Sequence, residues 1–129
     1  MSTQLYLSEL GNKQFQYFQE GITLPYEFRK SQLLLLKAAI ETYQDEIIEA
    51  LHKDLGKSEF ETYTTEIGFV LSEIKHTLKH LAKWMQPEKR SSPMALFPSK
   101  SKIINQPYGK TLIIAPWNYP FQLQNNLRL

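Results

Sequence analysis

The sequence predicts a mainly α-helical chain with a short pair of β-strands near its C-terminal end. In residues 25–54 and again in residues 58–86, apolar side chains recur at steps of three and four, which is typical of amphipathic helices. Residues 102–115 are instead rich in β-branched side chains, with proline and glycine between two apolar runs. We therefore expect an N-terminal helix, a long antiparallel helical hairpin and two short strands.

The composition is that of one small globular unit. The chain has 129 residues, of which 42% are hydrophobic and 22% charged, so an ordered core is favoured over disorder. The net charge is only +2, and no nucleic-acid partner is expected because the basic residues form no single stripe. No apolar stretch is long enough for a membrane span or a secretory signal, so a cytoplasmic location is expected.

The first helix is expected over residues 2–20. Gly21 is a plausible stop, because glycine readily adopts the left-handed conformation that ends many helices. A loose apolar stripe would face the core, formed by Leu7, Leu10, Tyr17 and Phe18.

The second helix is expected to run unbroken over residues 25–54. Pro25 suits a first helical turn because its missing N–H would have no helical partner there, and Gly56 is the expected C-terminal glycine. Its apolar stripe comprises Leu33, Leu36, Ile40, Tyr43, Ile47 and Leu51.

The third helix is expected over residues 58–86. Ser58 and Glu61 form a capping-box pattern at its start, and Pro87 marks its end. Glu59, Glu61 and Glu66 are interpreted as the helix start and its exposed face, while the apolar stripe comprises Tyr63, Ile67, Val70, Ile74, Leu78, Leu81 and Met85. Two such helices joined by a few residues should pack antiparallel, stripe against stripe.

The remaining residues are expected to form an irregular loop over 87–102 and strands over 102–106 and 111–115. Leu112–Ala115 is continuously apolar, like a strand that is buried on both faces. The predicted organisation is a single unit over residues 1–129. Residues 1–86 form its helical region, and residues 87–129 form a loop and strands that lead into the start of an incomplete dinucleotide-binding domain.

The stretch from Pro107 to Phe121, PYGKTLIIAPWNYPF, resembles the aldehyde dehydrogenase superfamily, in which a P-x-G turn leads into an apolar strand ending in P-W-N-[YF]-P. Upstream, Phe28-Arg29, the string LHKDLGK at 51–57, Glu66-Ile-Gly and Trp84 look like the amino-terminal helices of the class 3-like, fatty-aldehyde branch. The resemblance covers about residues 18–124 and implies the amino-terminal part of the α/β aldehyde dehydrogenase fold.

The resemblance also implies a cofactor, NAD or NADP. Cofactors in open α/β sheets bind beyond the carboxyl ends of the strands. By resemblance the nicotinamide-ribose side of the cofactor cleft would be lined by Ile114, Ala115, Pro116 and Trp117. Because this is one wall of an incomplete site, the chain alone is expected to bind no cofactor.

Asn118 resembles the family's oxyanion-hole asparagine, the one catalytic residue retained. The family oxidises aldehydes to carboxylic acids through a cysteine thiohemiacetal and hydride transfer. An amide that donates to the developing oxyanion is typically worth about 2.7–4 kcal/mol. The alternative is that Asn118 only caps a turn before Pro120, a place that asparagine favours.

The rest of the family's catalytic machinery is missing. The chain has no cysteine, hence no disulfide and no thiolate nucleophile, and the general-base glutamate lies beyond residue 129 in the family. The departure from the family pattern after Gln124 predicts a truncation or a frameshift. An inactive aldehyde dehydrogenase fragment is therefore expected, and the alternative is a non-catalytic helical module that assembles with itself or with a full-length relative. A homo-oligomer or swapped dimer is the expected assembly, with an aldehyde substrate only in the full-length family.

Two further signals have simpler interpretations. His76 and His80 have a metal-binding spacing, but no third ligand is evident, and we interpret them as surface histidines with no metal. The basic residues Lys89, Arg90, Lys100 and Lys102 are interpreted as a solvated linker, because no aromatic residues alternate with them to stack on bases.

Overall fold

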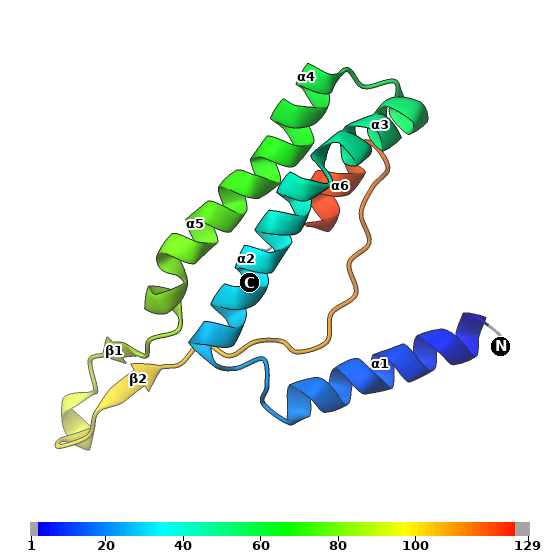
Figure 1. The fold of residues 1–129 in the computed structure, drawn as a ribbon. Coiled ribbons are helices and arrows are strands. Elements are labelled where there is room, and N and C mark those ends of the chain that lie inside the picture. Colours follow the sequence, from blue (N-terminus) through cyan, green and yellow to red (C-terminus); the bar gives the residue numbers. More distant parts are fainter. Residues whose placement is uncertain (1–2, 126–129) are drawn as a thin grey trace.

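A computed structural model describes residues 3–125 of the chain. Figure 1 shows a helical hairpin at its centre, with α1 (Thr3–Gln19) and a small β-hairpin projecting near one end. The predicted fold class, mainly α-helical with one short pair of strands, is confirmed. None of the described helices is long and apolar enough to cross a membrane.

The first helix forms as expected, but its apolar stripe does not face a core. Leu7, Leu10 and Tyr17 are exposed, and only Phe18 is half-buried. Phe18 lies against Gly109, whose φ is +85° and where an added Cβ would come within 3.0 Å of the Phe18 ring. The extended chain around Gly109 is too narrow to cover a whole helix face, so most of the stripe stays exposed.

The prediction of one unbroken second helix is wrong. Helix α2 (Tyr26–Thr42) ends at Tyr43, which has φ −99° and ψ 20°, and α3 (Gln44–Leu55) follows at once. The Tyr43 N–H still donates to Ala39 and its carbonyl still accepts from Ile47, both at 3.0 Å, so the bend keeps these backbone bonds. The bend turns α3 away from the line of α2 (Figure 1), and Tyr43 is exposed rather than in the core.

The third segment begins where the capping pattern predicts. The Ser58 hydroxyl accepts a hydrogen bond from the Glu61 N–H at 3.2 Å, and α4 (Glu59–Thr62) starts there. The preceding helix ends at Gly56 in the left-handed conformation, with φ 67°, as predicted.

A π-helical turn, η1 (Tyr63–Ile67), interrupts the third segment before α5 (Gly68–Trp84). The hydrogen-bonded ring of a π-turn is wider than that of an α-turn, and here the Gly68 N–H closes it by donating to the Tyr63 carbonyl five residues earlier. A Cβ on Gly68 would lie 2.9 Å from that carbonyl oxygen, so this turn needs glycine. The turn also shifts the buried face: Tyr63 is exposed, whereas Thr62 and Glu66 are fully buried, which corrects the predicted stripe.

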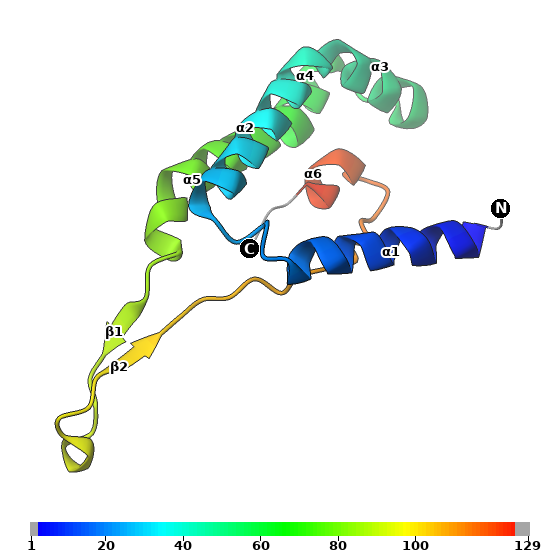
Figure 2. The ribbon, with the colours of Figure 1, turned by 60° about the horizontal axis from the view of Figure 1, so that its bottom comes forward.

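The hydrophobic core lies between α2 and α5, which confirms the expected packing of the two helices against each other. These helices lie side by side in both views (Figures 1 and 2). Leu51 is also buried, and the core cluster itself comprises Leu33, Ile40, Ile67, Val70, Ile74 and Leu81.

The strands form at different positions from those expected. β1 (Glu88–Arg90) pairs antiparallel with β2 (Ser101–Ile103), on either side of a 3₁₀ turn at Met94–Leu96, so the predicted loop over 87–102 contains most of the hairpin. Residues 111–115 form no strand, and Leu112 and Ile114 are exposed. A strand that is buried on both faces needs neighbours, and the described residues supply none beside this segment. The division into regions 1–86 and 87–129 stays a prediction.

Candidate functional site

The P-W-N-Y-P string at 116–120 lies where an extended segment meets a short helix. This segment runs from β2 past α1 and enters α6 (Pro120–Gln124), which lies between the helical hairpin and α1 in Figure 2. Pro120 suits the first turn of α6 because no N–H is needed there. The Leu123 N–H donates to the Tyr119 carbonyl at 3.0 Å, which closes the first turn.

A buried ion pair lies directly beside this string. Lys57 follows the left-handed Gly56, and Glu66 lies within the π-turn. The Lys57 ammonium donates to Glu66 Oε1, and the two side chains are 8% and 0% exposed. No other ion pair between described residues is buried in this way, since the other three are formed by exposed side chains.

Lys57 holds the main chain of the string, and Glu66 holds the main chain of the helix that follows it. Lys57 Nζ donates to the Asn118 carbonyl oxygen at 2.9 Å and lies 4.2 Å from the centre of the Tyr119 ring. Glu66 Oε2 accepts a hydrogen bond from the Gln122 N–H at 2.8 Å. The side chain of Phe121, between these contacts, packs against the hydrophobic core.

These partners explain how a lysine is accommodated in the interior. A buried charge is tolerated when it is paired and its remaining hydrogens are bonded, and the Lys57 ammonium has a carboxylate, a carbonyl and an aromatic face around it. The Lys57 main chain is held as well, with its carbonyl 3.0 Å from His52 Nδ1. Because a carbonyl only accepts, this contact places a hydrogen on the Nδ1 of His52.

The predicted site residues are brought together only in part. The main chain of Asn118 is anchored at the ion pair, while the residue itself is exposed. Ile114 and Trp117 are each 84% exposed, Pro116 is exposed and Ala115 half-buried. Within residues 3–125 these four residues therefore form one open side of a site and do not enclose a dinucleotide.

The sequence interpretation missed Lys57 and Glu66 as site residues. Glu66 was expected on the exposed face of its helix, but its side chain is completely buried because of the π-turn, so that expectation is wrong. One signal was available in the sequence: Glu66 lies four residues before Val70, a member of the predicted apolar stripe, and residues four apart share a helix face.

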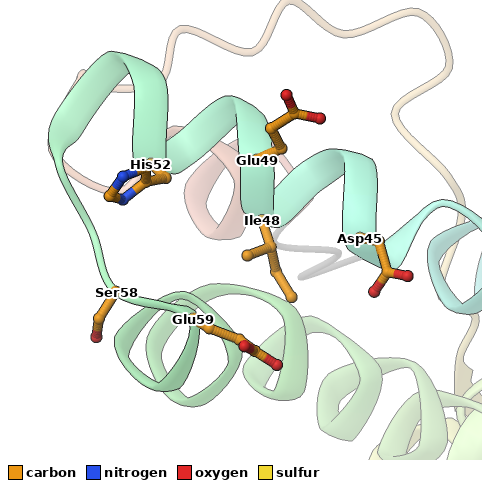
Figure 3. A pocket seen from close by; sticks show the side chains of 6 residues that line it. All are labelled: Asp45, Ile48, Glu49, His52, Ser58 and Glu59. Atoms are coloured by element: carbon orange, nitrogen blue, oxygen red, sulfur yellow. The ribbon is translucent and has the colours of Figure 1, made fainter.

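A separate open cleft of about 440 Å³ lies between α3 and the start of α4, away from the string. Figure 3 shows Ile48 pointing from α3 toward the chain at Ser58 and Glu59, with Asp45 and His52 on either side and Glu49 pointing away. A hydrogen bond from Lys53, together with its charge, lowers the pKa of Glu49 from its ordinary value. No catalytic constellation is evident among these lining side chains.

The two histidine rings of α5 are neighbours on one helix face, tilted by 32° to each other. The His76 and His80 ring centres are 4.2 Å apart, and the His80 ring stacks on Trp84 at 5.6 Å. The described part of the chain contains no group of three or more potential metal ligands.

Comparison of the sequence with known proteins identifies its family. Residues 14–126 match the aldehyde dehydrogenase family. A similar curated relative is 4,4'-diaponeurosporen-aldehyde dehydrogenase of Staphylococcus aureus, 49% identical over 107 residues, which are 83% of this chain and 23% of the relative. Aldehyde dehydrogenase family 3 member H1 of Arabidopsis thaliana is 41% identical over 106 residues, which are 82% of this chain and 22% of that protein.

The fold gives the same result. A solved structure described as the substrate-bound state of Staphylococcus aureus AldH matches with a TM-score of 0.88 and 44% identity, over 91% of this chain and 26% of that one. The chain therefore spans between 22% and 26% of the length of these relatives. Because the family match covers most of its residues and the fold agrees with it, this chain belongs to the aldehyde dehydrogenase family and corresponds to the amino-terminal region of its class 3 members.

Proposed function

We propose that this chain supplies the amino-terminal helical region and the oxyanion donor of an NAD(P)-dependent aldehyde dehydrogenase. The observation that carries the proposal is the placement of Asn118, which lies on an exposed bend with its main-chain oxygen anchored to Lys57 at 2.9 Å. An anchored backbone with an exposed carboxamide suits a group that must donate to a reacting atom.

The proposed role of Asn118 is electrostatic. In the family reaction a cysteine thiolate adds to the aldehyde carbonyl, and negative charge develops on the carbonyl oxygen. The Asn118 Nδ2 hydrogens would donate to that oxygen without introducing a charge of their own. The family uses NAD(P), which receives the hydride, and the residues at 114–117 would contribute one side of its site. The 129 residues include no cysteine, so the nucleophile must come from another part of an aldehyde dehydrogenase.

The 129-residue chain by itself is expected to show neither aldehyde oxidation nor tight NAD or NADP binding. A catalytic unit that lacks its nucleophile loses most of its rate, and one open apolar wall does not offset the entropy of fixing a dinucleotide. Measurement of NADH production with a medium-chain aldehyde tests for aldehyde oxidation, and isothermal calorimetry tests for cofactor binding. Micromolar cofactor binding, or turnover that persists in a preparation free of full-length enzyme, would contradict the proposal.

A chimera provides the positive arm of this test. Residues 14–125 of this chain replace the matching region of the Staphylococcus aureus relative, whose own remainder supplies the missing parts. We expect the chimera to form NADH from an aldehyde that the relative oxidises. A folded chimera of the same oligomeric state as the unmodified relative, but without turnover, would show that this amino-terminal region does not support the family's chemistry.

Self-association is a second candidate function, favoured by the exposed apolar chain at residues 112–114. Leu112 and Ile114 are exposed although their sequence is typical of a buried strand, and unpaired strand backbone is a template for pairing with another chain. We propose that two copies associate through this segment as a homodimer or swapped dimer. Light scattering is expected to show a dimer that Ile114→Lys converts to a monomer, and a monomer of the original chain at high concentration would refute this.

A further inference from the structure

We propose that Lys57 and Glu66 are positioning residues for Asn118. Together they hold the main chain on both sides of Tyr119 and Pro120, and so fix the position of the backbone from which the Asn118 carboxamide projects. This inference rests on the proposed oxyanion role of Asn118 and assigns the residues that orient it.

Two anchor points make this arrangement specific. Lys57 Nζ binds the carbonyl oxygen of Asn118 at 2.9 Å, and Glu66 Oε2 binds the N–H of Gln122 at 2.8 Å. These contacts join residues 61 and 56 positions apart in the sequence, and both reach main-chain atoms. They therefore constrain the backbone of the bend while leaving the carboxamide of Asn118 available to a substrate.

The ion pair itself is held rigidly on two sides. Lys57 is preceded by Gly56 in the left-handed conformation, and its carbonyl contacts His52. Glu66 lies in the π-turn, whose hydrogen bond is donated by Gly68. Its neighbour in the turn, Ile67, is fully buried in the core. Groups that orient a catalytic residue are effective when their own conformations are fixed by packing, and both members of this pair meet that condition.

Helix α6 depends on this pair for its N-terminal hydrogen bonding. The first N–H groups of a helix have no partner within it, and Tyr119, the residue at the N-cap of α6, makes no capping bond with its side chain. Glu66 accepts from Gln122 instead, across the fold. A pair that served stability alone could be replaced by apolar side chains of similar volume, whereas a positioning pair could not.

Amide hydrogen exchange on the chain itself tests the proposal. The double variant Lys57→Met/Glu66→Met is expected to keep the hairpin folded but to lower the exchange protection of Leu123 and Asn125 in α6 by about tenfold or more, the effect of losing a hydrogen bond to a charged group. Protection of Met85 at the end of α5 should stay within about twofold, as expected when only a local unit opens. The Asn118 carboxamide resonances should also shift and broaden.

The matched control is the exposed pair Glu49–Lys53 on α3, with 2.5 Å between its charged atoms. Lys53→Met/Glu49→Met removes the same charges and should leave α6 exchange and the Asn118 resonances unchanged. The proposal is overturned if Lys57→Met/Glu66→Met also leaves α6 exchange and the Asn118 resonances unchanged.

If the double variant loosens α5 as well, the two losses of protection are compared. Protection of Leu123 and Asn125 in α6 is expected to fall about tenfold further than that of Met85, and equal losses at the two places would overturn the proposal. An inactive chimera would defeat the function proposed for Asn118 but would leave this exchange result unaffected, so the two failures are distinguishable.

Discussion

Replacing Asn118 with alanine in the active chimera is expected to lower kcat by about 10²–10³-fold, the usual cost of losing one oxyanion donor. The carboxamide would act mainly when charge has developed on the carbonyl oxygen, so KM for the aldehyde should change little. Steady-state rates of NADH formation over a range of aldehyde concentrations separate kcat from KM.

The matched control for this prediction is Asn105→Ala. Asn105 is also an exposed asparagine, and its side chain donates to the Trp84 carbonyl at 3.1 Å, far along the chain from the bend. Its replacement should leave kcat within about twofold, as for most surface substitutions away from special features. If Asn118→Ala and Asn105→Ala have equal rates, the oxyanion role of Asn118 is wrong.

Removing one member of the buried ion pair is expected to lower the free energy of unfolding by about 3–5 kcal/mol. Lys57→Met leaves the Glu66 carboxylate buried without its cation, and Glu66→Met leaves the ammonium without its carboxylate. That loss is a large share of the roughly 5–15 kcal/mol that stabilises a typical domain. Urea unfolding followed by circular dichroism at 222 nm measures it.

The double variant should be much more stable than either single variant, because no unpaired charge remains in the interior. At the exposed Glu49–Lys53 pair, each single methionine substitution should change stability by about 1 kcal/mol or less. Similar losses at the two pairs would mean that the Lys57–Glu66 pair is solvated in solution, contrary to its burial in the structure.

Local signals in the sequence were sufficient for the helix ends and for the family. The Ser58 cap and the left-handed Gly56 formed as predicted, because both depend on backbone groups within a few residues of each other. The string at 116–120 similarly identified the family without any structure.

Other features of the fold depart from the regular patterns on which the sequence prediction depends. The bend at Tyr43 and the π-turn at 63–67 each interrupt a regular apolar period, and a count of steps of three and four passes over such interruptions. The segment at 111–115 has the composition of a strand, but a strand also needs a partner, and composition carries no information on whether one is present.

The sequence by itself therefore determined the helical class, the helix caps and the family to which the chain belongs. Only the tertiary structure showed that Glu66 is buried and that, with Lys57, it holds the bend around Asn118. The reason is physical: a capping bond is made within one turn of chain, whereas these contacts join residues 56 and 61 positions apart. Residues so far apart in the sequence come into contact through the packing of the whole chain, so a pattern within one short stretch does not predict the contact.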